Sequence, residues 1–158
     1  MNEEKLQFLK KEFIPLLQKI DPDTKPVWGK MNLQQMIEHL SGAVKIATGT
    51  LRLPGTTEPN DGGKSYAFLM SDKPFRENIA NPLLSEEPYP LRNHTLQAAI
   101  GELQGNLLEF FRAFENEKDK RVLNAIFGNL NFAEQTQLLY KHALHHLRQF
   151  GVEPIIKA

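Results

Sequence analysis

Apolar residues recur every three or four positions in four separate segments of the chain, which is the spacing of one face of an α-helix. The first segment contains Pro15, which lacks a backbone N–H group, so we expect a kink or a restarted helix there. Four amphipathic helices of this length predict an all-α four-helix bundle. The stripes are Leu6, Leu9, Phe13, Leu16 and Ile20; Leu33, Met36 or Ile37, Leu40 and Val44; Leu96, Ile100, Leu103, Leu107, Phe110 and Phe114; and Leu139, Ala143, Leu147 and Phe150.

Two of the predicted helices begin with the pattern of a capping box, in which the first and fourth residues satisfy each other's backbone N–H groups. Asn32 and Gln35 open the second helix in this way, and Asn131 and Glu134 open the fourth. The fourth helix is expected to stop at Gly151, because glycine commonly follows the last helical turn.

The connection between the second and third helices, residues 49–93, holds six of the ten prolines and four of the ten glycines, which interrupt helices. Within it, we expect a short helix over residues 64–70 and extended chain over residues 81–90. The third helix then begins after a cap at Asn93 or Thr95. So long a connection can act as a crossover, which lets helices two and three run parallel instead of forming a hairpin.

Length and composition indicate one domain over residues 1–158. The 19 Lys and Arg residues balance the 19 Asp and Glu residues, so the formal net charge is zero and we expect neither a nucleic-acid partner nor a membrane partner. No apolar run is long enough to cross a membrane, and Met1 to Lys5 lack the basic-then-apolar order of a signal peptide. We therefore expect a cytoplasmic protein.

The strongest candidate for chemistry is a histidine cluster on the fourth helix, in a chain with no cysteine to act as ligand or nucleophile. His142 and His146 are four residues apart, so they lie one turn apart on one face and can hold one divalent metal ion. His39, at the edge of the second helix's stripe, is the candidate third ligand if the two helices face each other. Three neutral imidazoles with open positions are typical of catalytic sites and suit zinc, nickel, iron or copper. His145 is expected to point outward, toward solvent or in support of the ligands.

Each of these histidines also has a simpler interpretation. His39 could be a histidine at the edge of the core with its hydrogen bonds satisfied, and the others could be polar surface residues. Gln35 and Gln149 could hydrogen-bond near a metal, but solvated polar faces are the preferred interpretation. We expect Trp28 to plug the core at the entry to the second helix and His94 to lie on the surface.

Two stretches of the chain resemble the DinB/YfiT-like superfamily of metalloenzymes. Residues 28–40 resemble its second helix, and residues 127–150 resemble its final helix, where members typically carry His, three residues, His, and a Gln shortly after. Residues 71–74 resemble a subgroup of uncharacterised bacterial members, many from Bacteroidetes. The resemblance covers nearly the whole chain, although Leu147 and Arg148 stand where an Arg-Gly pair is frequent.

This resemblance implies an up-down-down-up four-helix bundle with a long crossover between helices two and three. It also implies a divalent metal ion, Zn, Ni or Fe, held by His39, His142 and His146. Characterised relatives include S-transferases that use low-molecular-weight thiols such as bacillithiol or mycothiol, and others have been proposed as hydrolases or isomerases. Dimers are common in the family, so a homodimer is expected.

Three functions follow as hypotheses. The leading one is a metal-dependent transferase that moves a small-molecule thiol to an electrophilic small molecule, the metal stabilising the thiolate. Metal-assisted hydrolysis ranks second, because no general base is evident beside the histidines and Glu38 is expected to point away from the stripe. The third is a helical module without catalysis that binds a partner through its long connection.

Overall fold

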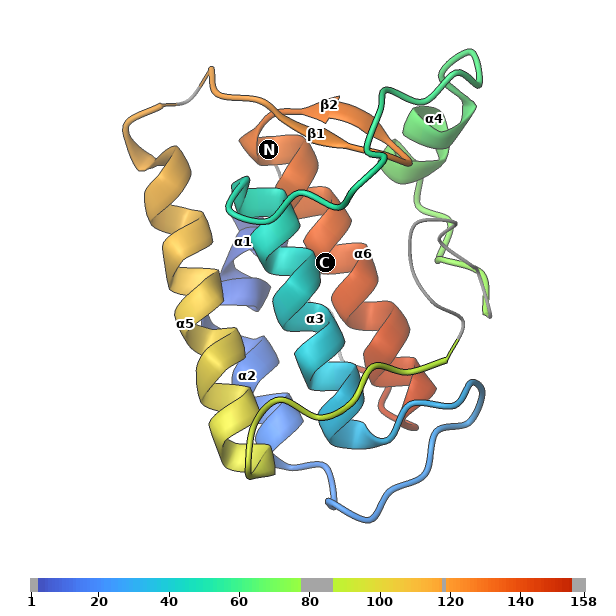
Figure 1. The fold of residues 1–158 in the computed structure, drawn as a ribbon, viewed down its shortest axis with the longest axis vertical. Coiled ribbons are helices and arrows are strands. Elements are labelled where there is room, and N and C mark those ends of the chain that lie inside the picture. The colour runs from blue at the N-terminus through green and yellow to red at the C-terminus, as the bar shows by residue number, and fades with distance from the viewer. Residues whose placement is uncertain (1–2, 78–86, 118, 155–158) are drawn as a thin grey trace.

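The computed structural model describes residues 3–77, 87–117 and 119–154 (Figure 1). Helices contain most of these residues, and one antiparallel pair of strands joins them. The predicted short helix over residues 64–70 is confirmed, whereas most of the segment predicted to be extended, residues 81–86, lies outside the described residues. The elements are α1 (Glu3–Gln7), a π-helical turn (Phe8–Glu12), α2 (Phe13–Gln18), α3 (Leu33–Thr48), α4 (Lys64–Met70), α5 (Leu96–Glu115), β1 (Val122–Asn124), β2 (Gly128–Leu130) and α6 (Phe132–Gln149).

The helical segment α1–α2 and the three long helices α3, α5 and α6 lie side by side (Figure 1). Helices α3 and α5 run in one direction, and α1–α2 and α6 run in the other. The strand pair and α4 lie together at one end of the helices. Within the described residues, no helix is long and apolar enough to span a membrane.

The all-α prediction is confirmed in part: the described residues are mostly helical, but β1 and β2 form a short antiparallel hairpin between α5 and α6. The Asn124 side chain accepts hydrogen bonds from the backbone N–H groups of Ile126 and Phe127, which closes the turn. Gly128 then takes a φ of 103°, a conformation that favours glycine. Helical periodicity gives no signal for three-residue strands, and the turn-forming residues Asn124 and Gly128, four positions apart, are the only local clue to the hairpin in the described residues of this segment.

The predicted stripes form the core, except that Leu16 and Leu96 are only half-buried and Leu17, which the predicted stripe omits, is buried in place of Leu16. Leu17, Met36, Leu103, Phe110 and Leu147, which come from α2, α3, α5 and α6, are fully buried. Burying a side chain of this size contributes about 1.5–3 kcal/mol, so the four stripes supply the main force that holds the helices together.

The first helical segment is interrupted where the sequence predicts. The Phe13 N–H donates to the Phe8 carbonyl, five residues back, which defines a π-helical turn just before Pro15. Proline has no N–H to donate, and its ring collides with the carbonyl four residues earlier in a regular helix. The wider π turn accommodates it, so the stripe continues into α2.

The capping predictions are confirmed at three helix starts. Capping boxes form at Asn32 with Gln35 and at Asn131 with Glu134. Thr95, and not Asn93, caps α5 by accepting a hydrogen bond from the Ala98 N–H. Asn93 instead belongs to a polar cluster around Glu38.

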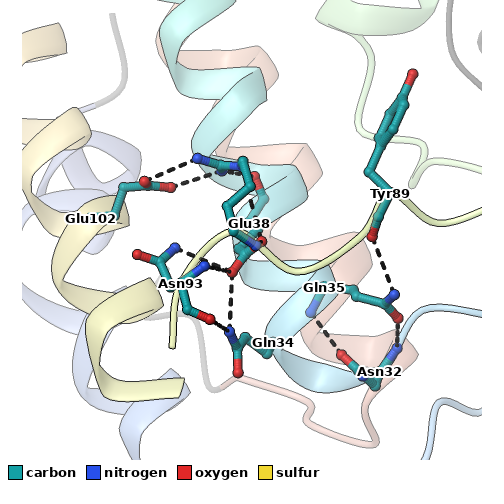
Figure 2. Close-up of polar contacts among 8 residues, drawn as sticks. Asn32, Gln34, Gln35, Glu38, Tyr89, Asn93 and Glu102 are labelled. Atoms are coloured by element: carbon teal, nitrogen blue, oxygen red, sulfur yellow. Dashed lines mark hydrogen bonds and ion pairs between the residues drawn. The ribbon is translucent and has the colours of Figure 1, made fainter. Parts of the chain in front are cut away.

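The carboxylate of Glu38 on α3 holds the end of the long connection in place (Figure 2). It accepts hydrogen bonds from the backbone N–H groups of Arg92 and Asn93, at 2.8 and 3.0 Å, and from the side chains of Asn93 and Gln34. The Arg92 guanidinium also pairs with Glu102 on α5 at 2.8 Å. Burial alone raises the pKa of Glu38, but these donors outweigh it and lower the pKa to about 2.

We predict that Glu38→Gln lowers the free energy of unfolding by about 2–3 kcal/mol at pH 7, because the new amide presents a donor to groups that are themselves donors. The folded-state pKa lies below the ordinary value of 4.5, so this stabilisation is present above about pH 4.5 and is lost as the pH falls toward 2. Denaturant unfolding of both proteins at several pH values between 7 and 2 measures the difference.

The matched control is Glu109→Gln, which removes an ion pair with Arg112 whose side chains are 67% and 70% exposed. Exposed pairs contribute at most about 1 kcal/mol. A difference between wild type and Glu38→Gln that stayed constant down to pH 2 would contradict the assigned role of the Glu38 carboxylate.

Candidate metal centre

Three histidines from two helices converge where α3 packs against α6. His39 lies in the middle of α3, and His142 and His146 lie one turn apart on α6. The His142 Nε2 is 3.1 Å from the His39 Nε2 and 2.9 Å from the His146 Nε2. One ligand atom from each ring lies within 4.8 Å of the other two, so these three side chains are close enough to bind one metal ion.

Hydrogen bonding alone does not satisfy this arrangement. A ring nitrogen carries either one hydrogen or one lone pair in the ring plane, so it makes one well-directed hydrogen bond. The His142 Nε2 nevertheless has two imidazole nitrogens as neighbours. Two nitrogen ligands about 2.0–2.1 Å from a shared ion lie roughly 3.3–3.4 Å apart at the tetrahedral angle, close to the observed spacing. A cation between the rings therefore fits the donor set better than pairwise hydrogen bonds do.

Burial keeps the imidazoles neutral. It lowers the pKa of His39 to about 4, with a further lowering from His145. The pKa values of His142 and His146 are also well below the ordinary range, first because of burial and then because of the neighbouring histidines. Neutral rings have a lone pair to offer a metal at pH 7, whereas imidazolium rings do not.

Gln149 orients His146. Its Oε1 lies 2.7 Å from the His146 Nδ1, and its Nε2 donates to the Trp28 carbonyl at 3.0 Å. With the amide nitrogen directed at a carbonyl, the Oε1 faces the ring and the His146 Nδ1 carries the hydrogen. The His146 Nε2 therefore presents its lone pair to the other two histidines. Gln149 is 3% exposed, so the interpretation of this residue as a solvated polar side chain is wrong.

The loop that receives Gln149 requires a glycine. Gly29 has a φ of 78°, and a Cβ built there would lie 2.9 Å from the Gln149 Nε2. The Val27 N–H also donates to the Gln149 carbonyl at 2.7 Å. Residues 27–29 are thus fixed to the C-terminal end of α6, close to the histidines.

Of the two positions expected for His145, the one facing solvent is wrong, whereas its ring lies against that of His146, with ring centres 4.9 Å apart, as a position in support of the ligands requires. His145 is 9% exposed, its ring centre is 5.3 Å from that of Trp28, and it hydrogen-bonds with the backbone of Phe75. The helical period places His145 outside the apolar stripe and so predicts exposure to solvent. The residue that covers it, Phe75, comes from the connection 49–93, far away in the sequence. Trp28 is half-buried and contacts this histidine, in addition to its backbone contact with Gln149.

The other polar candidates lie outside the cluster. Gln35 completes the α3 capping box and donates to the Tyr89 carbonyl (Figure 2). His94 is exposed, as predicted. Glu38, expected from the sequence to point away from the apolar stripe, is buried in its own hydrogen-bond cluster with residues 92 and 93.

No protein-family model, curated protein or solved structure matches this chain. The resemblance to the DinB/YfiT-like superfamily therefore stays a prediction, and the three histidines with the residues around them are what indicates a metal site.

We predict that Gln149→Ala weakens metal binding about 10–100-fold, because His146 loses the partner that fixes its ring and its protonated nitrogen. Titration of metal-free protein with Zn(II), followed by calorimetry or by competition with a chromophoric chelator, measures the affinity. Gln97→Ala, which removes an exposed glutamine of α5, is the control and should bind as wild type does. Equal affinities for the two variants would contradict the role given to Gln149.

Proposed function

We propose that this protein is a metal-dependent enzyme of the DinB/YfiT-like type that transfers a small-molecule thiol to an electrophile. The observation that carries the proposal is the convergence of the His39, His142 and His146 Nε2 atoms. Three neutral nitrogen ligands leave coordination positions open, as catalytic metal sites do and closed structural sites do not. The ion is divalent, and Zn, Ni and Fe all suit this donor set.

The arrangement of the helices supports the same assignment. We propose an up-down-down-up four-helix bundle made of α1–α2, α3, α5 and α6, in which the connection 49–93 is the crossover. The common direction of α3 and α5 favours it (Figure 1), because two parallel neighbours in the sequence need a long connection. The short strand pair is an addition at one end.

The chain's own residues would act mainly by binding the metal ion and by orienting its ligands. His39, His142 and His146 would bind the ion, with Gln149 orienting His146. A bound divalent ion lowers the pKa of a thiol and stabilises the thiolate, which is the nucleophilic form. Because the chain contains no cysteine, the thiol comes from the substrate.

The proposed reaction needs no oxidant or reductant. The substrate thiol releases its proton to water, its sulfur forms a bond to the electrophilic carbon, and the leaving group departs with the electron pair of the bond that breaks. With a haloarene as electrophile, the products are a thioether, a halide ion and a proton.

Hydrolysis by a metal-bound water is less well supported. It calls for a general base beside the water, and Glu38, the carboxylate next to His39 in the sequence, is occupied by donors from Gln34, Arg92 and Asn93. Its pKa of about 2 also makes it a weak base. A helical module without catalysis would not require three imidazole nitrogens to meet.

We predict that His142→Ala reduces metal affinity more than about 100-fold and abolishes thiol transfer, because His142 contributes the central nitrogen of the three. Elemental analysis of untagged protein and an assay with metal-loaded protein, a small thiol and a chloronitroarene measure the two effects. Metal at about 100 times its Kd should raise the wild-type Tm by about 5–10 °C, and a chelator should reverse the rise.

The control is His94→Ala, which removes an exposed histidine outside the cluster. It should keep wild-type metal content and activity. If wild type neither retains nor gains metal, the proposed function is wrong. If it binds metal but gives no turnover above His142→Ala with any thiol, and hydrolyses esters or amides in a chelator-sensitive way, the transferase assignment gives way to hydrolysis.

A further inference from the structure

Three phenylalanines form a continuous aromatic surface beside the histidines, which we call the aromatic shelf: Phe68, Phe75 and Phe127. Phe75 stacks on Phe68 and on Phe127, with ring centres 6.0 Å apart in both pairs and an angle of only 9° between Phe75 and Phe127. All three side chains are half-buried. They come from α4, from the segment after it and from the turn between β1 and β2.

The shelf adjoins the candidate metal centre directly. The Phe75 ring centre is 6.1 Å from the ring centres of both His142 and His145. His39 and His142 keep part of their surface exposed, whereas His146 is 4% exposed. The partly open side of the histidine cluster thus includes His142, the residue that Phe75 contacts.

A buried lysine holds the shelf against α6. The Lys141 Nζ donates to the carbonyls of Phe68, Leu69 and Ser71 at 2.8, 3.3 and 3.1 Å, although the residue is only 6% exposed. It also lies 4.4 Å from the Phe68 ring centre and 5.4 Å from that of Phe75. An ammonium group buried this deeply needs partners that replace the water it has lost. Here the backbone carbonyls of the segment that carries the shelf supply them.

A second contact from α6 fixes the same segment. The Gln137 Nε2 donates to the Leu69 carbonyl at 3.0 Å, and its Oε1 accepts from the Lys5 Nζ at 2.7 Å. Beneath the shelf, Phe75 and Phe127 pack on a small cluster of Leu69, Leu130 and Leu138. The fold therefore covers part of the shelf through the leucine cluster, while all three rings stay half-exposed and Phe75 borders His142.

We propose that the aromatic shelf binds the apolar, planar part of a substrate whose sulfur is held at the metal centre. This inference rests on the proposed function and narrows it to thiols that carry an aromatic or similarly flat apolar group. Rings of this kind prefer offset-stacked or edge-to-face contacts with other rings, and each such pair contributes beyond its buried area. A small hydrophilic thiol would bind the metal without gaining this contact.

The test compares two thiols of similar acidity, benzyl mercaptan and 2-mercaptoethanol, on the protein loaded with Co(II). Coordination of a thiolate to Co(II) gives a near-ultraviolet charge-transfer band, so binding is measured without turnover. We expect benzyl mercaptan to bind about tenfold more tightly than 2-mercaptoethanol to wild type. Phe75→Ala should reduce the preference to less than about twofold, with unchanged affinity for Co(II), and Phe75→Tyr should keep it.

The matched control is Phe111→Ala, which removes another half-buried phenylalanine, on α5, and should leave the preference intact. Phe75→Leu, which retains an apolar side chain over the leucine cluster, serves if the alanine variant unfolds, and it should lower the preference as well. Equal binding of the two thiols to wild type, or a preference that survives in the Phe75→Ala and Phe75→Leu variants, would overturn the inference while leaving the metal centre in place. Failure of wild type to bind Co(II) would instead overturn the proposed function and this inference together.

Discussion

The rest of the site depends on the close approach of three imidazole nitrogens between α3 and α6. The His142 Nε2 has two nitrogen neighbours within 3.1 Å, although its ring plane offers only one hydrogen or one lone pair. Such a cluster persists in a buried place only if the packing of the two helices imposes it. Gln149 adds to this by fixing the hydrogen on the outer nitrogen of His146, so that the inner lone pair faces the cluster.

The irregular connection around the site is secured by two buried charges of opposite sign. Irregular backbone leaves N–H and C=O groups without the partners that a helix would supply, and the last turn of a helix such as α4 leaves its carbonyls without such partners too. Glu38 on α3 accepts from the N–H groups of residues 92 and 93, and Lys141 on α6 donates to the carbonyls of residues 68, 69 and 71. The negative carboxylate of Glu38 thus pairs with backbone N–H groups, and the positive ammonium group of Lys141 pairs with backbone carbonyls. Together they fix both described parts of the connection to the helices that carry the histidines.

Local signals explain which features could be predicted. The apolar stripes, the capping boxes at Asn32 and Asn131 and the interruption near Pro15 each depend on residues within a few positions of one another. The pairing of His142 with His146 is equally local, since it needs only the pitch of a helix. The addition of His39 required the further assumption that two apolar stripes face each other. The structure does bring His39 to this pair.

Contacts between distant segments explain what was missed. The helical period alone favours solvent-facing positions for His145 and Gln149, yet both are buried, because Trp28 and Phe75 come from connections whose course no periodic pattern describes. The same holds for Lys141, whose charge would ordinarily place it in water. The sequence by itself therefore determined the helices, their apolar faces and the spacing of two candidate ligands, since these follow from local geometry. Only the tertiary structure decided which polar side chains are buried and what they contact, because that depends on which distant backbone groups need partners.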